Sequence, residues 1–169
     1  MGTLNAFYVK TSSDSVIAAI RTGFPSATVK PGDGFVGYIL PDRTPGPPIT
    51  ELVQLSVDFS TDVIWLSFQS AVDAFAFHHW RAGQALRSLV YGYKEERIWE
   101  RVEGEAESWE REAFFSPYPA KMVVSENERR RWERICREAV LLPGQFEPCI
   151  SSRESARKAA EYYHFPGWS

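Results

Sequence analysis

Four short segments rich in aromatic and β-branched residues follow one another between residues 62 and 103, and they limit the possible folds of this chain more than any other feature. The segments span residues 63–68, 74–81, 86–93 and 97–103. Residues of these types favour strands, and the turn-like breaks between the segments allow each strand to lie beside the next. The sequence therefore predicts a four-stranded antiparallel meander.

The chain before the meander predicts further elements. They are a strand at 4–10, a helix that starts near Ser13 and ends by Gly23, and a hairpin of 27–30 and 35–40 that turns at Asp33-Gly34. Residues 41–48 hold four prolines and a glycine, which predicts a loop. The segment 50–60 alternates like a strand, but its length and apolar spacing also fit a helix. We interpret it as a helix.

After the meander the pattern changes to helix. Ser125-x-x-Glu128 and Ser151-x-x-Glu154 both match the capping box, in which Ser and Glu satisfy each other's backbone donors at a helix start. Each site is followed by a stripe of apolar residues, so we expect two C-terminal helices that lie on the sheet or its edge.

The predicted fold class is α+β, with a mainly antiparallel sheet and helices packed mainly on one face. A chain of 169 residues can bury an ordinary core without metals or disulfides. We expect residues 1–169 to form one domain, with a sheet-rich core at 1–115 and a helical part at 120–169.

Composition excludes some partners and indicates a compartment. The formal net charge is -3, whereas nucleic-acid binding needs a clustered surplus of Lys and Arg. No apolar run of about 18 residues could span a bilayer, and the start of the chain lacks an export signal. These features predict a cytoplasmic protein that binds neither nucleic acid nor membrane, with Cys136 and Cys149 as free thiols.

The meander contains the candidate binding surface. If Gly83-Gln84 is a two-residue turn, Trp80 lies opposite Arg87, and if 94–96 is a three-residue loop, Trp99 opposes Tyr91 and Glu103 opposes Arg87. One face then combines rings and charges, the composition of a recognition surface. Its residues are His78, Trp80, Arg87, Tyr91, Trp99, Arg101 and Glu103. The alternative is that helices cover these rings as part of an ordinary core.

The same register leaves His79 and Glu100 close together on the apolar face. A buried imidazole and carboxylate would shift each other's pKa, which is one sign of a functional site. The alternatives are a structural ion pair or exposure at the rim. Eight glutamates lie between Glu95 and Glu112, and we interpret their alternation with arginine as protection of an exposed edge strand.

No known catalytic, metal-binding or cofactor-binding motif fits the sequence. Residues 32–37 match G-x-G-x-x-G literally, but a strand follows where a dinucleotide site needs a helix. His78 and His79 are neighbours on a strand, so they point to opposite faces and cannot hold one metal together. We therefore expect no catalytic residue, no metal site and no cofactor.

Residues 72–89 carry the pattern V-D-x-F-x-F-x-x-W-x-x-G-x-x-x-R-S-L, and residues 96–104 read E-R-I-W-E-R-V-E-G. Together with the phrase F-P-G-W at 165–168, these segments resemble a bacterial family of unknown function. The resemblance implies bacterial origin and a single compact domain, and it assigns no activity and no catalytic residue.

The sequence favours a non-catalytic interaction or small-ligand-binding domain that uses the ring-and-charge face. One alternative is a hydrolase or transferase with a cleft formed by His79 and Glu100 or by Arg87 and Glu103. Another is a structural subunit that forms a homodimer through an exposed edge or aromatic patch. The partner is then an unknown protein or small molecule.

Overall fold

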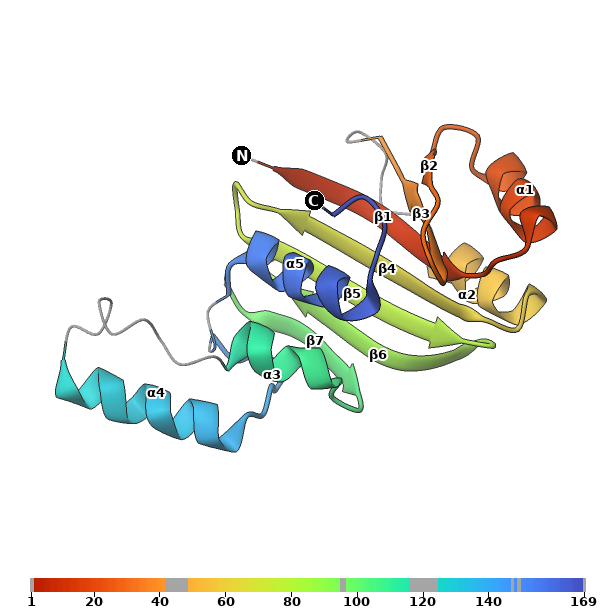
Figure 1. Ribbon diagram of the computed structural model, residues 1–169. Helices are drawn as coiled ribbons and strands as arrows, with labels where there is room; N and C mark the ends of the chain where they lie inside the picture. The colour runs from red at the N-terminus through yellow and green to blue at the C-terminus, as the bar shows by residue number, and fades with distance from the viewer. Residues whose placement is uncertain are drawn as a thin grey trace.

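The computed structural model describes residues 2–41, 49–94, 97–115, 125–146, 148 and 150–168. Within these residues, seven strands form one antiparallel sheet in the order β2-β3-β1-β4-β5-β6-β7 (Figure 1). The strands are β1 (Thr3–Lys10), β2 (Thr28–Lys30), β3 (Phe35–Ile39), β4 (Asp62–Gln69), β5 (Ala74–Arg81), β6 (Gln84–Tyr91) and β7 (Trp99–Gly104). The α+β class, the β2–β3 hairpin and the β4–β7 meander are confirmed.

Five helices accompany the sheet in the described part of the chain. They are α1 (Asp14–Gly23), α2 (Ile49–Asp58), α3 (Ser108–Phe114), α4 (Glu126–Glu138) and α5 (Ser152–Tyr163). The helix favoured for 50–60 is confirmed as α2. Ser125 and Ser151 are the N-caps of α4 and α5, and their hydroxyls accept from the backbone N–H of Glu128 and Glu154, which is the serine half of each predicted capping box.

The helices are divided between the two faces of the sheet instead of lying mainly on one (Figure 1). We call these the α5 face, on which α3 and α5 pack, and the α2 face, on which α1 and α2 pack. On the α2 face, Ile20 and Leu52 pack with Trp80. Both faces carry buried apolar side chains, so each needs its own cover.

Helix α4 differs from the expectation that it lies on the sheet. None of its residues is buried, and Figure 1 shows it extending away from the sheet. Only its C-terminal part, with Ile135 and Cys136, touches the core of the α5 face.

The predicted register of the β5–β6 hairpin is wrong by one residue. The turn residues are Ala82 and Gly83, with φ of 46° and 84°, because a two-residue turn of this type needs positive φ at both positions. This turn alone would pair Arg87 with His78, and the bulge between His79 and Trp80 moves the pairing by one residue, so that Arg87 pairs with His79 instead of Trp80. A shift of one residue exchanges the faces.

The predicted β6–β7 register is correct at one end only. Tyr91 pairs with Trp99 as predicted, but an irregularity between Val90 and Tyr91 moves the rest of the strand by one position. Glu103 therefore pairs with Ser88, and Gly104 pairs with Arg87. The predicted side-chain pair of Arg87 and Glu103 is not formed, since Arg87 Nη1 donates instead to the backbone carbonyl of Glu103.

The interpretation of residues 95–112 as a protected edge strand is wrong beyond β7. The strand ends at Gly104, and the chain then forms α3 with Glu107 as its N-cap. Glu107 and Glu110 close a reciprocal capping box, and Glu110 is buried. These two carboxylates therefore face the interior.

Three predictions lie outside the described residues. They concern most of the proline-rich loop (42–48), two residues of the β6–β7 loop (Glu95 and Glu96) and Cys149. Among the helices that the structure describes, none is both long and apolar enough to cross a membrane.

Candidate functional site

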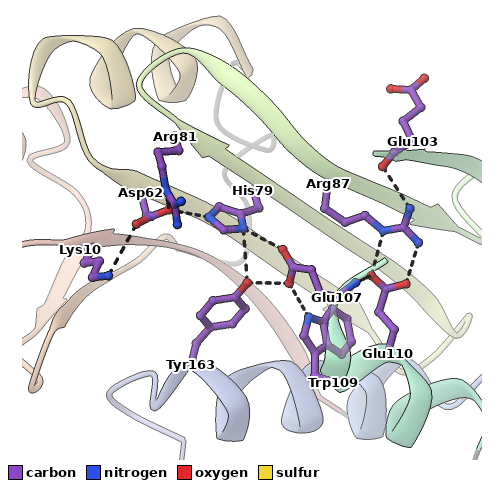
Figure 2. A network of polar contacts seen from close by, with 10 residues as sticks. All are labelled: Lys10, Asp62, His79, Arg81, Arg87, Glu103, Glu107, Trp109, Glu110 and Tyr163. Carbon is purple, nitrogen blue, oxygen red and sulfur yellow. Dashed lines mark hydrogen bonds and ion pairs between the residues drawn. The ribbon is translucent and has the colours of Figure 1, made fainter. Parts of the chain in front are cut away.

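Polar side chains on the α5 face form a network centred on His79 (Figure 2). His79 Nε2 lies 2.8 Å from Asp62 Oδ1, and His79 Nδ1 lies 2.8 Å from Glu107 Oε1. The Tyr163 hydroxyl and the Trp109 indole N–H each donate to Glu107 Oε2 at 2.6 Å. The network thus joins β4, β5, the residues before α3, and the end of α5.

Hydrogen bonding fixes what the His79 ring can do. Each ring nitrogen has a carboxylate oxygen of Asp62 or Glu107 at hydrogen-bond distance. A general base needs one ring nitrogen free for its substrate. Neither ring nitrogen of His79 is free, and the ring connects β4 and β5 to the start of α3.

The two carboxylates beside His79 are held in their charged forms. Burial alone would raise the pKa of Glu107, but hydrogen bonds from His79, Tyr163 and Trp109 outweigh it and lower that pKa below its usual value. Burial likewise opposes ionisation of Asp62, and hydrogen bonds from Arg81 and His79 lower its pKa.

A second buried ion pair lies beside this network. Arg87 Nε and Nη2 donate to the two carboxylate oxygens of Glu110 at 2.8 and 2.6 Å, and Arg87 Nη1 donates to the Gly104 carbonyl at 2.7 Å (Figure 2). Burial raises the pKa of Glu110 despite the bidentate contact with Arg87. Arg87, Glu107 and Glu110 also line a cavity of about 420 Å³.

The predicted pair of His79 and Glu100 is wrong. The Glu100 carboxylate instead accepts from the backbone N–H groups of Tyr93 and Lys94, the latter at 2.6 Å. Glu100 lines a hollow on the α2 face, away from the His79 network. The β5–β6 register is the physical reason, because its bulge places His79 on the face opposite to that of Val90, which lines the hollow together with Glu100.

The hollow on the α2 face has a volume of about 280 Å³ and lies on the central strands of the meander. We call it the α2-face hollow. Its lining residues are Ile49, Trp65, Ala76, His78, Val90, Tyr93, Lys94, Glu100 and Arg101. Buried Ala76 and His78 form its floor, while Lys94 and Arg101 are exposed at its rim.

Stacked rings run from the floor of this hollow into the core. The ring centroids of Trp65 and His78 are 5.3 Å apart with an interplanar angle of 11°, and those of His78 and Trp80 are 5.4 Å apart at 4°. Burial, followed by the positive charge of Arg101, lowers the pKa of His78 to about 4. His78 is therefore an uncharged flat ring near neutral pH.

The stack is held by hydrogen bonds at its edges. His78 Nδ1 lies 3.1 Å from the Ser88 hydroxyl, and the Trp65 indole N–H donates to Asn5 Oδ1 at 2.9 Å. The hydroxyl of Tyr93, another lining residue, lies 2.8 Å from that of Ser67. The aromatic lining is thus fixed before any ligand arrives.

The structure separates the seven residues predicted to share a binding face. His78 and Arg101 line the α2-face hollow, and Trp80 is buried beside them under α2. Glu103 is exposed near Arg101, at 3.8 Å between their charged atoms. The other three, Arg87, Tyr91 and Trp99, are buried on the α5 face. The three predicted aromatic rings therefore do not form a surface together.

Sequence reasoning missed Trp65 and Tyr93 as lining residues. Trp65 lies directly opposite His78 across β4 and β5, so the pairing of β4 was the missing signal. Tyr93 follows β6 and is 45% exposed.

Among the described residues, no group of three or more His, Cys, Asp or Glu side chains is arranged to hold a metal ion. Comparisons with protein-family models, with curated protein sequences and with solved structures gave no match. The resemblance to a bacterial family therefore stays a prediction, and the candidate function depends on the site itself.

Proposed function

We propose that this chain is a non-catalytic binding module that takes a small molecule in the α2-face hollow. The observation that supports it is the combination of a ring stack, Trp65 on His78, with the exposed charged groups of Lys94 and Arg101 around one concavity. Small-molecule sites are concave and mostly apolar, with a few polar groups that fix orientation.

The polar clusters of the α5 face support binding less well. His79 is occupied by two carboxylates, and the Arg87 guanidinium by Glu110 and two backbone carbonyls. Groups that satisfy one another in this way stabilise a fold and have little capacity left for a ligand.

Nuclear magnetic resonance with a mixture of small aromatic and aliphatic fragments tests the proposal. Tyr93 and Tyr162 make a matched pair, since their exposed fractions are 45% and 50% but only Tyr93 lines the hollow. We expect at least one fragment to shift the Trp65 indole and His78 ring signals, with the shift lost in Tyr93→Ala and kept in Tyr162→Ala. Fragments that leave both signals unmoved in the wild-type protein would refute the proposal.

The cavity beside Glu107 and Glu110 supports a second candidate, a hydrolase or transferase. The pKa of Glu110 is raised, chiefly by burial, while hydrogen bonds outweigh burial and lower that of Glu107, and such a divided pair can supply an acid and a base. Both line the cavity of about 420 Å³. Assays with a panel of activated esters and phosphate esters would test it. Turnover lost in Glu107→Gln, under conditions in which urea unfolding shows that variant to be folded, and kept in Glu112→Gln would favour this function over binding alone.

A further inference from the structure

The size of the α2-face hollow limits its ligand. Its volume of about 280 Å³ lies just below the range for pockets that bury drug-sized molecules, roughly 300–1,000 Å³. Beside His78, the floor is formed by the smaller side chains of Ala76 and Val90, which pair with each other across β5 and β6. A molecule of one or two rings fits this space.

The floor favours a flat ring over an aliphatic group. Trp65 is only partly buried and forms the outer end of the stack with His78 and Trp80. Offset stacking on such rings contributes about 0.5–1.5 kcal/mol beyond the area that is buried. Tyr93 also lines the hollow, and its hydroxyl is hydrogen-bonded to that of Ser67, which lies on β4 like Trp65.

The rim favours a negative group on that ring. Two cations, Lys94 and Arg101, line the hollow, against one carboxylate, Glu100. Glu100 is already bound to the backbone N–H groups of Tyr93 and Lys94. Lys94 makes no ion pair with any residue that the structure describes, and Arg101 has only the 3.8 Å contact with Glu103, whose side chain is 67% exposed.

We propose that the α2-face hollow binds a flat aromatic acid of one or two rings, with the ring against Trp65 and His78 and the carboxylate at Lys94 and Arg101. This inference rests on the proposed function and names its ligand class. A ring that carries a cation is the main competitor, because Trp65 and Tyr93 could also attract it through their faces.

Four probes of similar size separate these possibilities. They are indole-3-acetate, indole-3-acetamide, tryptamine and cyclohexylacetate, each titrated into the full chain while the Trp65 indole and His78 ring signals are followed. We expect indole-3-acetate to bind about tenfold more tightly than indole-3-acetamide and tryptamine, the margin of one hydrogen-bonded charge contact. Cyclohexylacetate keeps the carboxylate and lacks only ring stacking, so we expect it to bind about two- to tenfold more weakly than indole-3-acetate.

Variants at the rim test the role of charge without touching the core. Lys94→Gln with Arg101→Gln should weaken indole-3-acetate by about tenfold or more and leave indole-3-acetamide unchanged. Arg97→Gln is the matched control, because Arg97 is exposed near the same loop, is paired with Asp73, and does not line the hollow.

The outcomes distinguish the two proposals. If none of the four probes moves the signals but a fragment of the mixture does, the binding function stands and the aromatic-acid inference is wrong. If neither the probes nor the fragments move them, the proposed function fails. If the amide, tryptamine or cyclohexylacetate binds at the hollow as tightly as indole-3-acetate, the binding function stands and the aromatic-acid inference is wrong. Equal affinity of the double variant and the wild-type protein for indole-3-acetate would also overturn the inference.

Discussion

His78 and His79 are adjacent in β5, yet their rings lie on opposite faces of the sheet in opposite chemical settings. His78 is stacked between Trp65 and Trp80, with a pKa lowered to about 4 by burial and by Arg101. His79 is held between the carboxylates of Asp62 and Glu107. The alternation of side chains along a strand thus places a neutral ring in the candidate site and a paired ring in the core.

Stability should fall in mild acid because of His78. The unfolded chain gains a proton near the ordinary histidine pKa of about 6.5, whereas the folded ring stays neutral down to about pH 4. The contribution is therefore present above pH 6.5 and is lost as pH falls toward 4. Between pH 7.5 and 5 we expect a loss of about 2 kcal/mol in the free energy of unfolding, measured with urea.

The control for this titration is the exposed histidine that ends α5. His164 has a φ of 54°, which asparagine tolerates, so His164→Asn should keep the acid loss. His78→Phe preserves a ring in the stack and should remove most of that loss. A pH dependence that survives in His78→Phe would show that another group is responsible.

Glu107 should stabilise the attachment of α5 to the sheet. Glu107→Gln keeps the shape but removes the charge that faces His79 and accepts from Tyr163, so we expect a loss of about 2–4 kcal/mol. Hydrogen exchange of the α5 amides should accelerate together with the drop in urea stability. Glu112→Gln is the matched control, since Glu112 also pairs with α5, through Lys158, but its side chain is 76% exposed. We expect Glu112→Gln to lower the free energy of unfolding by less than about 0.5 kcal/mol. Equal losses in the two variants would contradict a special stabilising role for the contacts of Glu107 with His79 and Tyr163.

Local patterns were sufficient to predict the strands and most helices. The capping serines at 125 and 151, the Asp33-Gly34 reversal and the β-branched runs of the meander each act within a few residues. Register is different, because it depends on where the turn lies and on any bulge in the strand pairing. The choice between Ala82-Gly83 and Gly83-Gln84 moves the pairing by two residues and keeps the faces, whereas the bulge between His79 and Trp80 exchanges the faces of Arg87 and Tyr91.

Sequence reasoning predicted only part of the candidate site, because the residues that share a face depend on how the strands pair. His78 and Arg101 were predicted, whereas Trp65 reaches the hollow through the β4–β5 pairing, which no short motif encodes. The burial of Glu107 and Glu110 was hidden because glutamates beside arginines normally indicate a solvated surface. Glu107 instead contacts His79, and Glu110 contacts Arg87. Both contacts join residues far apart in the chain, so they are seen only in the folded structure.

The buried pair of Arg87 and Glu110 should show strong coupling. Arg87→Leu alone leaves a buried carboxylate without its partner, and Glu110→Leu alone leaves a buried guanidinium, so each should cost about 3–5 kcal/mol. The double variant should be more stable than the sum of the two losses predicts, although the Gly104 carbonyl also loses its donor. Chemical unfolding of all four proteins gives the coupling energy. The more exposed pair of Arg97 and Asp73 is the comparison, and we expect a coupling energy of about 1 kcal/mol or less there. Additive losses at Arg87 and Glu110 would show that these two residues do not stabilise each other directly.

Gly104 should be indispensable at the end of β7. Its φ is +82°, and a Cβ at this position would lie 2.0 Å from the Leu86 carbonyl oxygen of the neighbouring strand. Because that obstacle is backbone, Gly104→Ala must separate β6 from β7 and disturb the carbonyl that binds Arg87, and we expect a loss of at least about 3 kcal/mol. Gly144→Ala measures the cost of a positive φ alone, because Gly144 has φ of +80° and nothing lies within 4 Å of an added Cβ. We expect this variant to lose about 1–2 kcal/mol in the free energy of unfolding. The difference between the two variants in thermal or urea unfolding measures the close approach of β6 and β7, and equal losses would mean that φ alone requires glycine at residue 104.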